Sequence, residues 1–78
     1  MMRYFFDTSI GDSHMRDEDG LDYADLARAR QDARRSLAAL VVEALSRDAS
    51  HCSVTMRDSG GTVIARFFAD LGADAGTA

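Results

Sequence analysis

Lysine and proline are missing from this 78-residue chain, and cysteine occurs only once. A lone Cys52 cannot form an internal disulfide, which indicates a reducing compartment. No apolar run approaches the roughly 18 residues that a membrane-spanning helix needs. The amino terminus lacks the apolar core of a secretory signal, because Arg3 and Asp7 flank its aromatic residues. We therefore expect a cytoplasmic protein with no membrane partner.

Without lysine, all nine basic residues are arginine, whose side chain suits planar, bidentate and stacking contacts. The net charge of −4 argues against a protein that coats nucleic acid through bulk electrostatics, although it leaves room for a local basic face. A hydrophobic content of 46% with 28% charged residues is typical of a globular chain. So small a domain buries only about 60% of its unfolded surface, so a partner subunit would add to its stability.

Periodicity divides the chain into strands and one helix. Aromatic and β-favouring residues over 2–10 predict a strand, and residues 13–16 a short second strand after the turn at Gly11-Asp12. Residues 23–47 contain no glycine and place apolar residues at three- and four-residue steps, which predicts a long amphipathic helix. A period of two returns over 51–57 and 62–71, separated by a hairpin loop.

This order of elements predicts an α+β fold, in which one long helix packs on one face of a four-stranded antiparallel sheet. We expect a single domain over residues 1–71. Residues 72–78 are small and polar, which is typical of a flexible C-terminal tail.

Several ordered blocks of the sequence carry a resemblance to a known family: "MRYFFD" (2–7), Asp12 in the first turn, "RDEDGLDYADL" (16–26), "ARQDARRSLAAL" (29–40) and "VTMRDSGGTVIARFFADL" (54–71). They resemble a family of short bacterial proteins known only as a domain of unknown function. Its members show an RYFF-type opening, a D-x-x-G segment before the helix and an R-D-x-x-G hairpin. The resemblance implies this fold and a bacterial cytoplasmic setting, and it implies no activity.

The acidic segment 17–22 invites interpretation as a metal site. A calcium loop of the EF-hand type needs oxygen ligands at positions 1, 3 and 5 and a glycine at position 6. With Asp17 as position 1, Leu21 falls at position 5 and Asp22 at position 6, so the register fails. The cluster Asp17-Glu18-Asp19 is left without an assigned role.

A helix start accounts for the rest of this segment. Gly20 supplies a turn, Asp22 is a favoured N-cap residue, and Asp25 three residues later imitates a capping box. Leu21 and Leu26 occupy the positions of a hydrophobic staple. We therefore predict that the helix is capped at Asp22.

Two histidines and the cysteine do not form a recognisable site. His14, His51 and Cys52 are one ligand short of a closed zinc site. His51 and Cys52 are adjacent, so on a strand their side chains point to opposite faces, and Cys52 alternates with core positions as a buried thiol. Gly60-Gly61 precedes no helix and indicates a turn rather than a phosphate cradle. We expect no catalytic residue, no cofactor and no metal ion.

The functional prediction concerns the side of the sheet away from the helix, which we call the open face. We expect the helix to cover Tyr4, Phe6, Thr8, Cys52, Val54, Met56, Val63, Ala65 and Phe67. The open face then carries four arginines among apolar residues, and its members are Arg3, Phe5, Asp7, Arg16, Thr55, Arg57, Ile64, Arg66 and Phe68. Because like charges repel, we expect Arg57 and Arg66 to lie offset or beside carboxylates.

Three interpretations of the open face follow. A homodimer or a small protein partner would bury its apolar residues, with Arg3 or Arg66 pairing to Asp7 across the interface. A single-stranded nucleic acid or another anionic ligand would stack on Phe5 and Phe68 while arginines hold phosphates. The third is a solvated face on which arginine stems cover scattered apolar groups. We favour a non-enzymatic interaction module that forms a homodimer or binds a protein, because the net acidity counts against nucleic acid.

Overall fold

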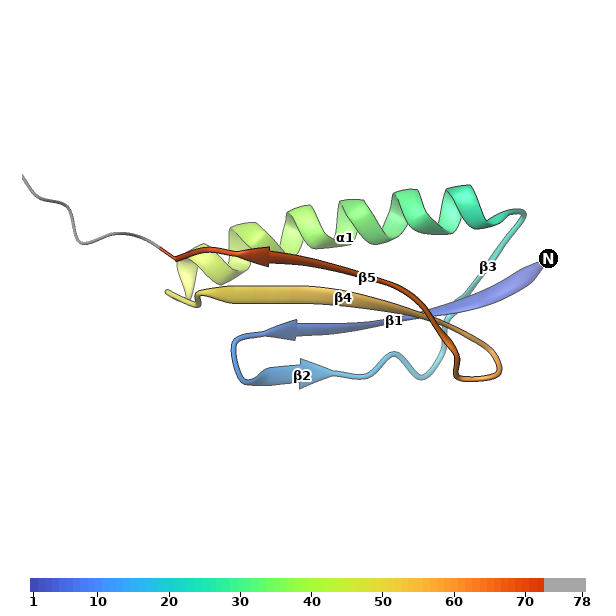
Figure 1. Ribbon diagram of the computed structural model, residues 1–78, viewed down its shortest axis with the longest axis horizontal. Helices are drawn as coiled ribbons and strands as arrows, with labels where there is room; N and C mark the ends of the chain where they lie inside the picture. The colour runs from blue at the N-terminus through green and yellow to red at the C-terminus, as the bar shows by residue number, and fades with distance from the viewer. Residues whose placement is uncertain (73–78) are drawn as a thin grey trace, which may run out of the picture.

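The computed structural model describes residues 1–72 and contains an antiparallel sheet of five strands with one helix packed on it (Figure 1). The elements in chain order are β1 (Met2–Ile10), β2 (Ser13–Met15), β3 (Leu21–Tyr23), α1 (Leu26–Ser46), β4 (His51–Asp58) and β5 (Val63–Asp70). The predicted α+β fold is confirmed, with one strand more than expected. The predicted tail lies, from residue 73 onward, outside the described residues.

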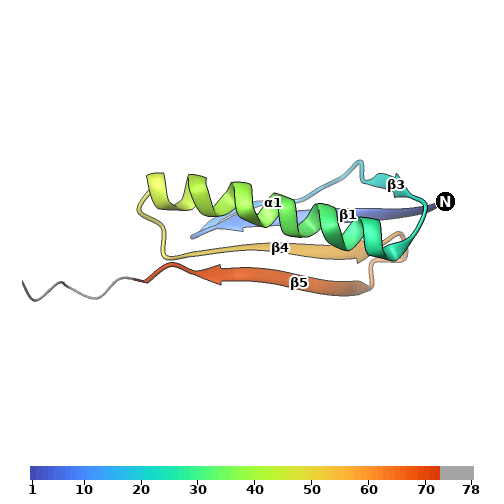
Figure 2. The ribbon, with the colours of Figure 1, turned by 90° about the horizontal axis from the view of Figure 1, so that it is seen from above.

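The sheet order is β2-β1-β4-β5, so the first strand of the chain lies in the centre beside β4. On its other side β1 pairs with β2 at one end and with β3 at the other end. Figure 2 shows α1 crossing the sheet at an angle, while β5 lies at the edge of the sheet to one side of the helix. No other described strand pairs with the outer side of β5.

The segment before the helix is the additional strand β3, which corrects the predicted cap. Asp22 lies directly opposite Arg3 of β1 and accepts hydrogen bonds from its Nε and Nη2 at 2.9 and 3.1 Å. The N-cap is Asp25, whose Oδ1 accepts a backbone N–H of the first helical turn at 2.8 Å. The predicted staple of Leu21 and Leu26 is wrong as well, because Leu21 belongs to β3 and is 60% exposed.

The core between α1 and the sheet is thin, because alanines bring the helix close to the strands. Ala29, Ala33 and Ala44 are fully buried. The fully buried side chains of β4 are Cys52, Val54 and Met56. The larger residues of the helix stripe are covered less: Leu37, Leu40 and Val41 are half-buried, and Leu26 and Leu45 are exposed. Much of the apolar side-chain surface of α1 is therefore exposed to solvent.

A β-bulge near the start of β5 reverses two predicted placements. Met56 pairs with Ala65 while Arg57 pairs with Val63, so Ile64 has no partner on β4. Ile64 packs against the core beneath the helix, whereas Val63 is 57% exposed and lies on the open face. The prediction of Ile64 on the open face and Val63 against the helix is wrong, because one extra residue reverses the alternation.

Candidate functional site: the open sheet face

The register of the strands decides which side chains are neighbours on the open face. Three rows run across β1, β4 and β5: Phe5, Arg57 and Val63; Asp7, Thr55 and Arg66; Ser9, Ser53 and Phe68. Of the other predicted members, Arg3 lies at one end of β1, and Arg16 is exposed after β2. Ile64 is the one that the structure removes from this face.

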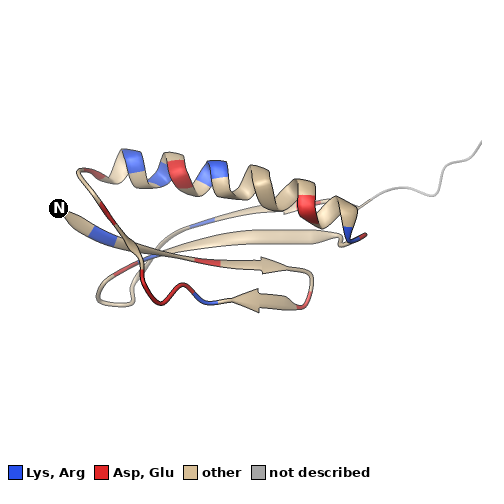
Figure 3. Cartoon of the chain, turned by 180° about the vertical axis from the view of Figure 1, so that it is seen from behind, with Lys and Arg blue, Asp and Glu red and all other residues tan. Residues whose placement is uncertain are grey.

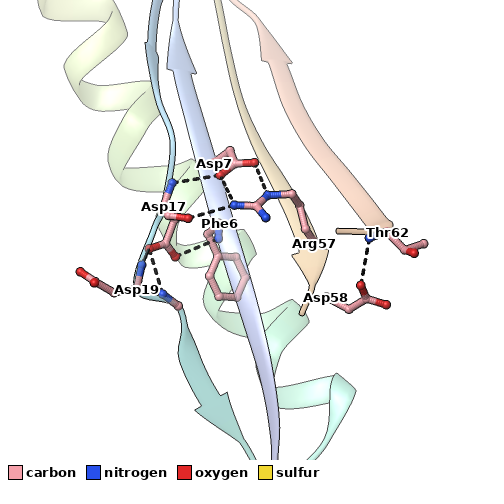
Figure 4. Close-up of polar contacts among 8 residues, drawn as sticks. Phe6, Asp7, Asp17, Asp19, Arg57, Asp58 and Thr62 are labelled. Atoms are coloured by element: carbon pink, nitrogen blue, oxygen red, sulfur yellow. Dashed lines mark hydrogen bonds and ion pairs between the residues drawn. The ribbon is translucent and has the colours of Figure 1, made fainter. Parts of the chain in front are cut away.

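At the centre of the open face, Asp7 and Arg57 form an ion pair that is largely shielded from solvent (Figure 4). Arg57 Nε and Nη2 donate to the two carboxylate oxygens of Asp7 at 2.6 and 3.1 Å. The guanidinium lies 5.0 Å from the centroid of the Phe5 ring. The hydrogen bond from Arg57 holds the pKa of Asp7 below its usual value, although partial burial opposes this effect. Arg57 therefore lies beside a carboxylate, as predicted.

This pair changes the predicted dimer contact. Asp7 already has an arginine partner in its own chain, and Arg3 is held by Asp22. In an interface in which Arg3 or Arg66 pairs with Asp7 of a second copy, Asp7 would have to accept that arginine in addition to Arg57, and Arg3 would also have to leave or share Asp22. The position of Asp7 thus favours a role in the fold of the single chain.

Asp17 belongs to the acidic cluster for which the sequence predicted no role, and in the structure its carboxylate is a hydrogen-bond acceptor (Figure 4). Its Oδ2 accepts the backbone N–H of Phe6 at 3.0 Å, and its Oδ1 accepts those of Asp19 and Gly20 at 3.2 and 3.0 Å. Its own N–H donates to Asp7 at 3.0 Å. Burial raises the pKa of Asp17, but the three N–H donors outweigh burial and hold that pKa below its usual value.

The carboxylate of Asp17 therefore serves as a hydrogen-bonding partner along the outer edge of β1. β2 pairs with residues 8–10 of β1 and β3 with residues 2–4, so Phe6 lies in the gap between them. The spacing Asp17-x-x-Gly20 carried a signal for this role, because aspartate side chains often accept from N–H groups two or three residues on. No group of three or more metal-ligating side chains gathers here or elsewhere in residues 1–72.

Gly20 makes the turn after Asp17, and it should not tolerate a side chain. Its φ is +68°, and a Cβ would lie 2.9 Å from both the carbonyl oxygen of Tyr4 and Cε2 of Phe5. We expect Gly20→Ala to lower the free energy of unfolding by about 2 kcal/mol or more, measured by urea denaturation. Gly61→Ala is the matched control, because Gly61 has φ +87° with no atom within 4 Å of a Cβ. Equal losses in the two variants would contradict a close approach at Gly20.

Near the opposite end of the open face, polar and aromatic groups meet. The hydroxyls of Ser9 and Ser53 are buried and lie 2.6 Å apart. His51 Nδ1 lies 2.8 Å from Asp70 Oδ1, and the imidazole stacks on the ring of Phe68 with centroids 6.1 Å apart. The hydroxyls bond each other rather than the imidazole, so this arrangement lacks the hydroxyl–imidazole contact that activates a nucleophile.

His14 and Cys52 do not come together. His14 lies opposite Ser9 and faces the open side, whereas Cys52 is fully buried beneath the helix. Burial raises the pKa of the Cys52 thiol, which disfavours the reactive thiolate.

Much of the positive charge of the open face is neutralised within the chain. Arg3 pairs with Asp22 and Arg57 with Asp7, while Arg16 and Arg66 form no ion pair with a described residue. Figure 3 shows further basic residues along the first half of α1, and acidic residues on the segment between β2 and β3. Two of the four arginines of the open face are therefore neutralised by carboxylates of the same chain.

In the described part of the chain, these features define a small α+β fold in which one helix covers one side of an antiparallel sheet and the other side is left open. The chain belongs to the family of a domain of unknown function, DUF6894, whose family model matches residues 3–70. Neither a curated protein nor a solved structure matches the chain. Within residues 1–72, no helix combines the length and the apolar character that crossing a membrane requires.

Proposed function

We propose that this protein is a non-enzymatic association module that binds another protein through the β5 side of its open face. The observation that carries the proposal is the exposure of Phe68, 59% of whose surface is open to solvent, on the same face as Val63 and Arg66. Aromatic residues and arginines are enriched at protein interfaces, and exposed apolar patches often mark them. The proposal includes a bacterial cytoplasmic setting, which the free thiol of Cys52 supports.

A single-stranded nucleic acid, or another anionic ligand, is the second candidate for the same surface. The stacked rings of His51 and Phe68 offer a platform for a base, and Arg66 lies on the same face without an ion pair to a described residue. Arg3 pairs with Asp22 and Arg57 with Asp7 of the same chain. These pairs count against this candidate, because they neutralise two of the cations that would hold phosphates. The protein partner is therefore the preferred function.

Photo-crosslinking in the native host tests the proposal. With p-benzoylphenylalanine in place of Phe68, we expect a cross-linked species of one defined protein mass. Ala39, an exposed residue of α1, is the control position and should give no such species. A nuclease-sensitive product would contradict the protein partner and favour the second candidate. Equal yields at positions 68 and 39, or no product at position 68, would contradict both candidates.

A further inference from the structure

Within residues 1–72, no strand pairs with the outer backbone edge of β5. The hydrogen bonds between β4 and β5 show which backbone groups of β5 point outward. Leu71 donates its N–H to the carbonyl of Ser50 at 2.7 Å, and these two residues extend the register between β4 and β5. Hydrogen-bonded and non-hydrogen-bonded pairs alternate along an antiparallel ladder. Odd-numbered residues of this stretch therefore bond to β4, and the N–H and C=O groups of Arg66, Phe68 and Asp70 point away from the sheet.

The two sides of the sheet differ in how far their backbone groups are paired. Along the outer side of β1, β2 and β3 pair with the strand, and Asp17 takes up the N–H of Phe6 in the gap between them. β5 has no such cover in the described chain, and it contains neither proline nor lysine (Figure 2). Its bulge at Ile64 lies near one end, so residues 65–70 remain regular. An exposed, regular edge strand readily pairs with another strand.

We infer that a second copy of this chain pairs with β5 edge to edge, antiparallel, with Phe68 opposite the second copy's Phe68. The inference rests on the proposed function and names its partner. In this register Arg66 lies opposite the second copy's Asp70, and symmetry repeats this pair of opposite charges. Asp70 Oδ1 already lies 2.8 Å from His51 Nδ1 of its own chain, but the Asp70 side chain is 75% exposed and its carboxylate can accept a second donor. The outward backbone groups of the two edges then face each other. On the helix side, Phe67 lies opposite the small Ala69, so the two copies form one continuous sheet.

The neighbouring registers fit less well. A symmetric pairing centred on Arg66 would place two guanidinium groups directly opposite each other, which is unfavourable. A pairing centred on Phe67 would bring the bulged Ile64 into the ladder, opposite Asp70 of the second copy. Only the register centred on Phe68 combines opposite charges with the regular part of β5.

Engineered cysteines test this register. Opposite residues of a hydrogen-bonded pair have Cα atoms about 5.5 Å apart, within the range that a disulfide bridges. Phe68→Cys should therefore form a disulfide-linked dimer under mild oxidation. Arg66→Cys should cross-link when it is mixed with Asp70→Cys but not by itself. Val63→Cys is the matched control, exposed on the same strand but outside the ladder, and the native Cys52 is buried. Equal cross-linking of Val63→Cys and Phe68→Cys, or none of Phe68→Cys, would overturn the register.

Charge exchange tests the dimer without a covalent bond. In sedimentation equilibrium across the micromolar range, the wild type should dimerise reversibly. Arg66→Asp should raise the dissociation constant about tenfold or more, because both symmetric pairs become like-charged. Combining it with Asp70→Arg should restore the dimer, because the pair is inverted. Thermal melts of each variant are the control for folding. A monomeric wild type, or a folded double variant that does not recover dimerisation, would overturn the inference.

The two proposals fail separately. If the purified chain is a monomer while position 68 cross-links to a different protein in the host, the second copy is wrong and the association module stands. If position 68 also gives no product, both proposals are wrong.

Discussion

Asp17→Ala is expected to lower the free energy of unfolding by about 3 kcal/mol, because it leaves backbone donors in a partly buried place without an acceptor. The carboxylate accepts from the N–H groups of Phe6, Asp19 and Gly20, and only the first belongs to regular secondary structure. Without this carboxylate, the N–H of Phe6, between the parts of β1 that pair with β2 and β3, would lose its acceptor. Urea denaturation measures the effect as a lower transition midpoint.

Two variants separate this hydrogen-bonding role from general loss of charge. Asp17→Asn keeps an oxygen that can accept from Asp19 and Gly20, but it places an amide donor beside the N–H of Phe6, so we expect an intermediate loss. Asp19→Ala removes a neighbouring exposed carboxylate and should change the stability by less than about 0.5 kcal/mol. A loss from Asp19→Ala as large as that from Asp17→Ala would show that charge, and not hydrogen bonding, is responsible.

Asp7→Asn is expected to lower the free energy of unfolding near neutral pH by about 2 kcal/mol, because it removes the charge that faces the guanidinium of Arg57. The effect should depend on pH in a defined direction. In the folded state the pKa of Asp7 lies below its usual value, whereas in the unfolded chain it is about 3.9. The stabilisation is therefore complete above the unfolded pKa and is lost as the pH falls through the folded pKa.

The measurement is a series of thermal melts of the wild type and Asp7→Asn between about pH 2 and pH 7. We expect the wild type to lose stability below about pH 4 more steeply than the variant, and the two curves to approach each other at the acid end. The pKa of Asp17 is also lowered, so the variant should still show some acid sensitivity. A constant difference between the two proteins at every pH would contradict the role of the Asp7 charge.

Local patterns in the sequence were sufficient to predict the long elements. The alternation in β1 and β4 and the helical stripe of α1 are properties of neighbouring residues, so their type and approximate ends were predictable. β3 was not, because its three residues become a strand only through pairing with β1, far away in the chain. The choice of the residue that caps α1 depended on the same pairing of β3 with β1. Asp22 and Asp25 are both good N-cap residues, and the pairing of Arg3 with Asp22 leaves Asp25 to cap the helix.

The candidate site was predictable only as far as the alternation of its strands held. Phe5, Asp7, Arg57 and Phe68 lie on the open face because the period of two is regular around them. Ile64 does not, because nothing in the run Val63-Ile64-Ala65 indicates which residue is left unpaired, and that depends on how the hairpin closes on β4. The contact between Asp7 and Arg57 likewise joins strands that are far apart in the sequence.

The central pairing of β1 with β4 has a consequence for how this chain folds. Its partners are separated by between 42 residues, for Ile10 and Cys52, and 54 residues, for Tyr4 and Asp58. Contacts between such distant residues require the closure of long loops before any pairing energy is gained, which makes folding slow. During synthesis β1 has no central partner until β4 has left the ribosome. The domain is therefore expected to fold late, in one cooperative step, rather than element by element as it emerges.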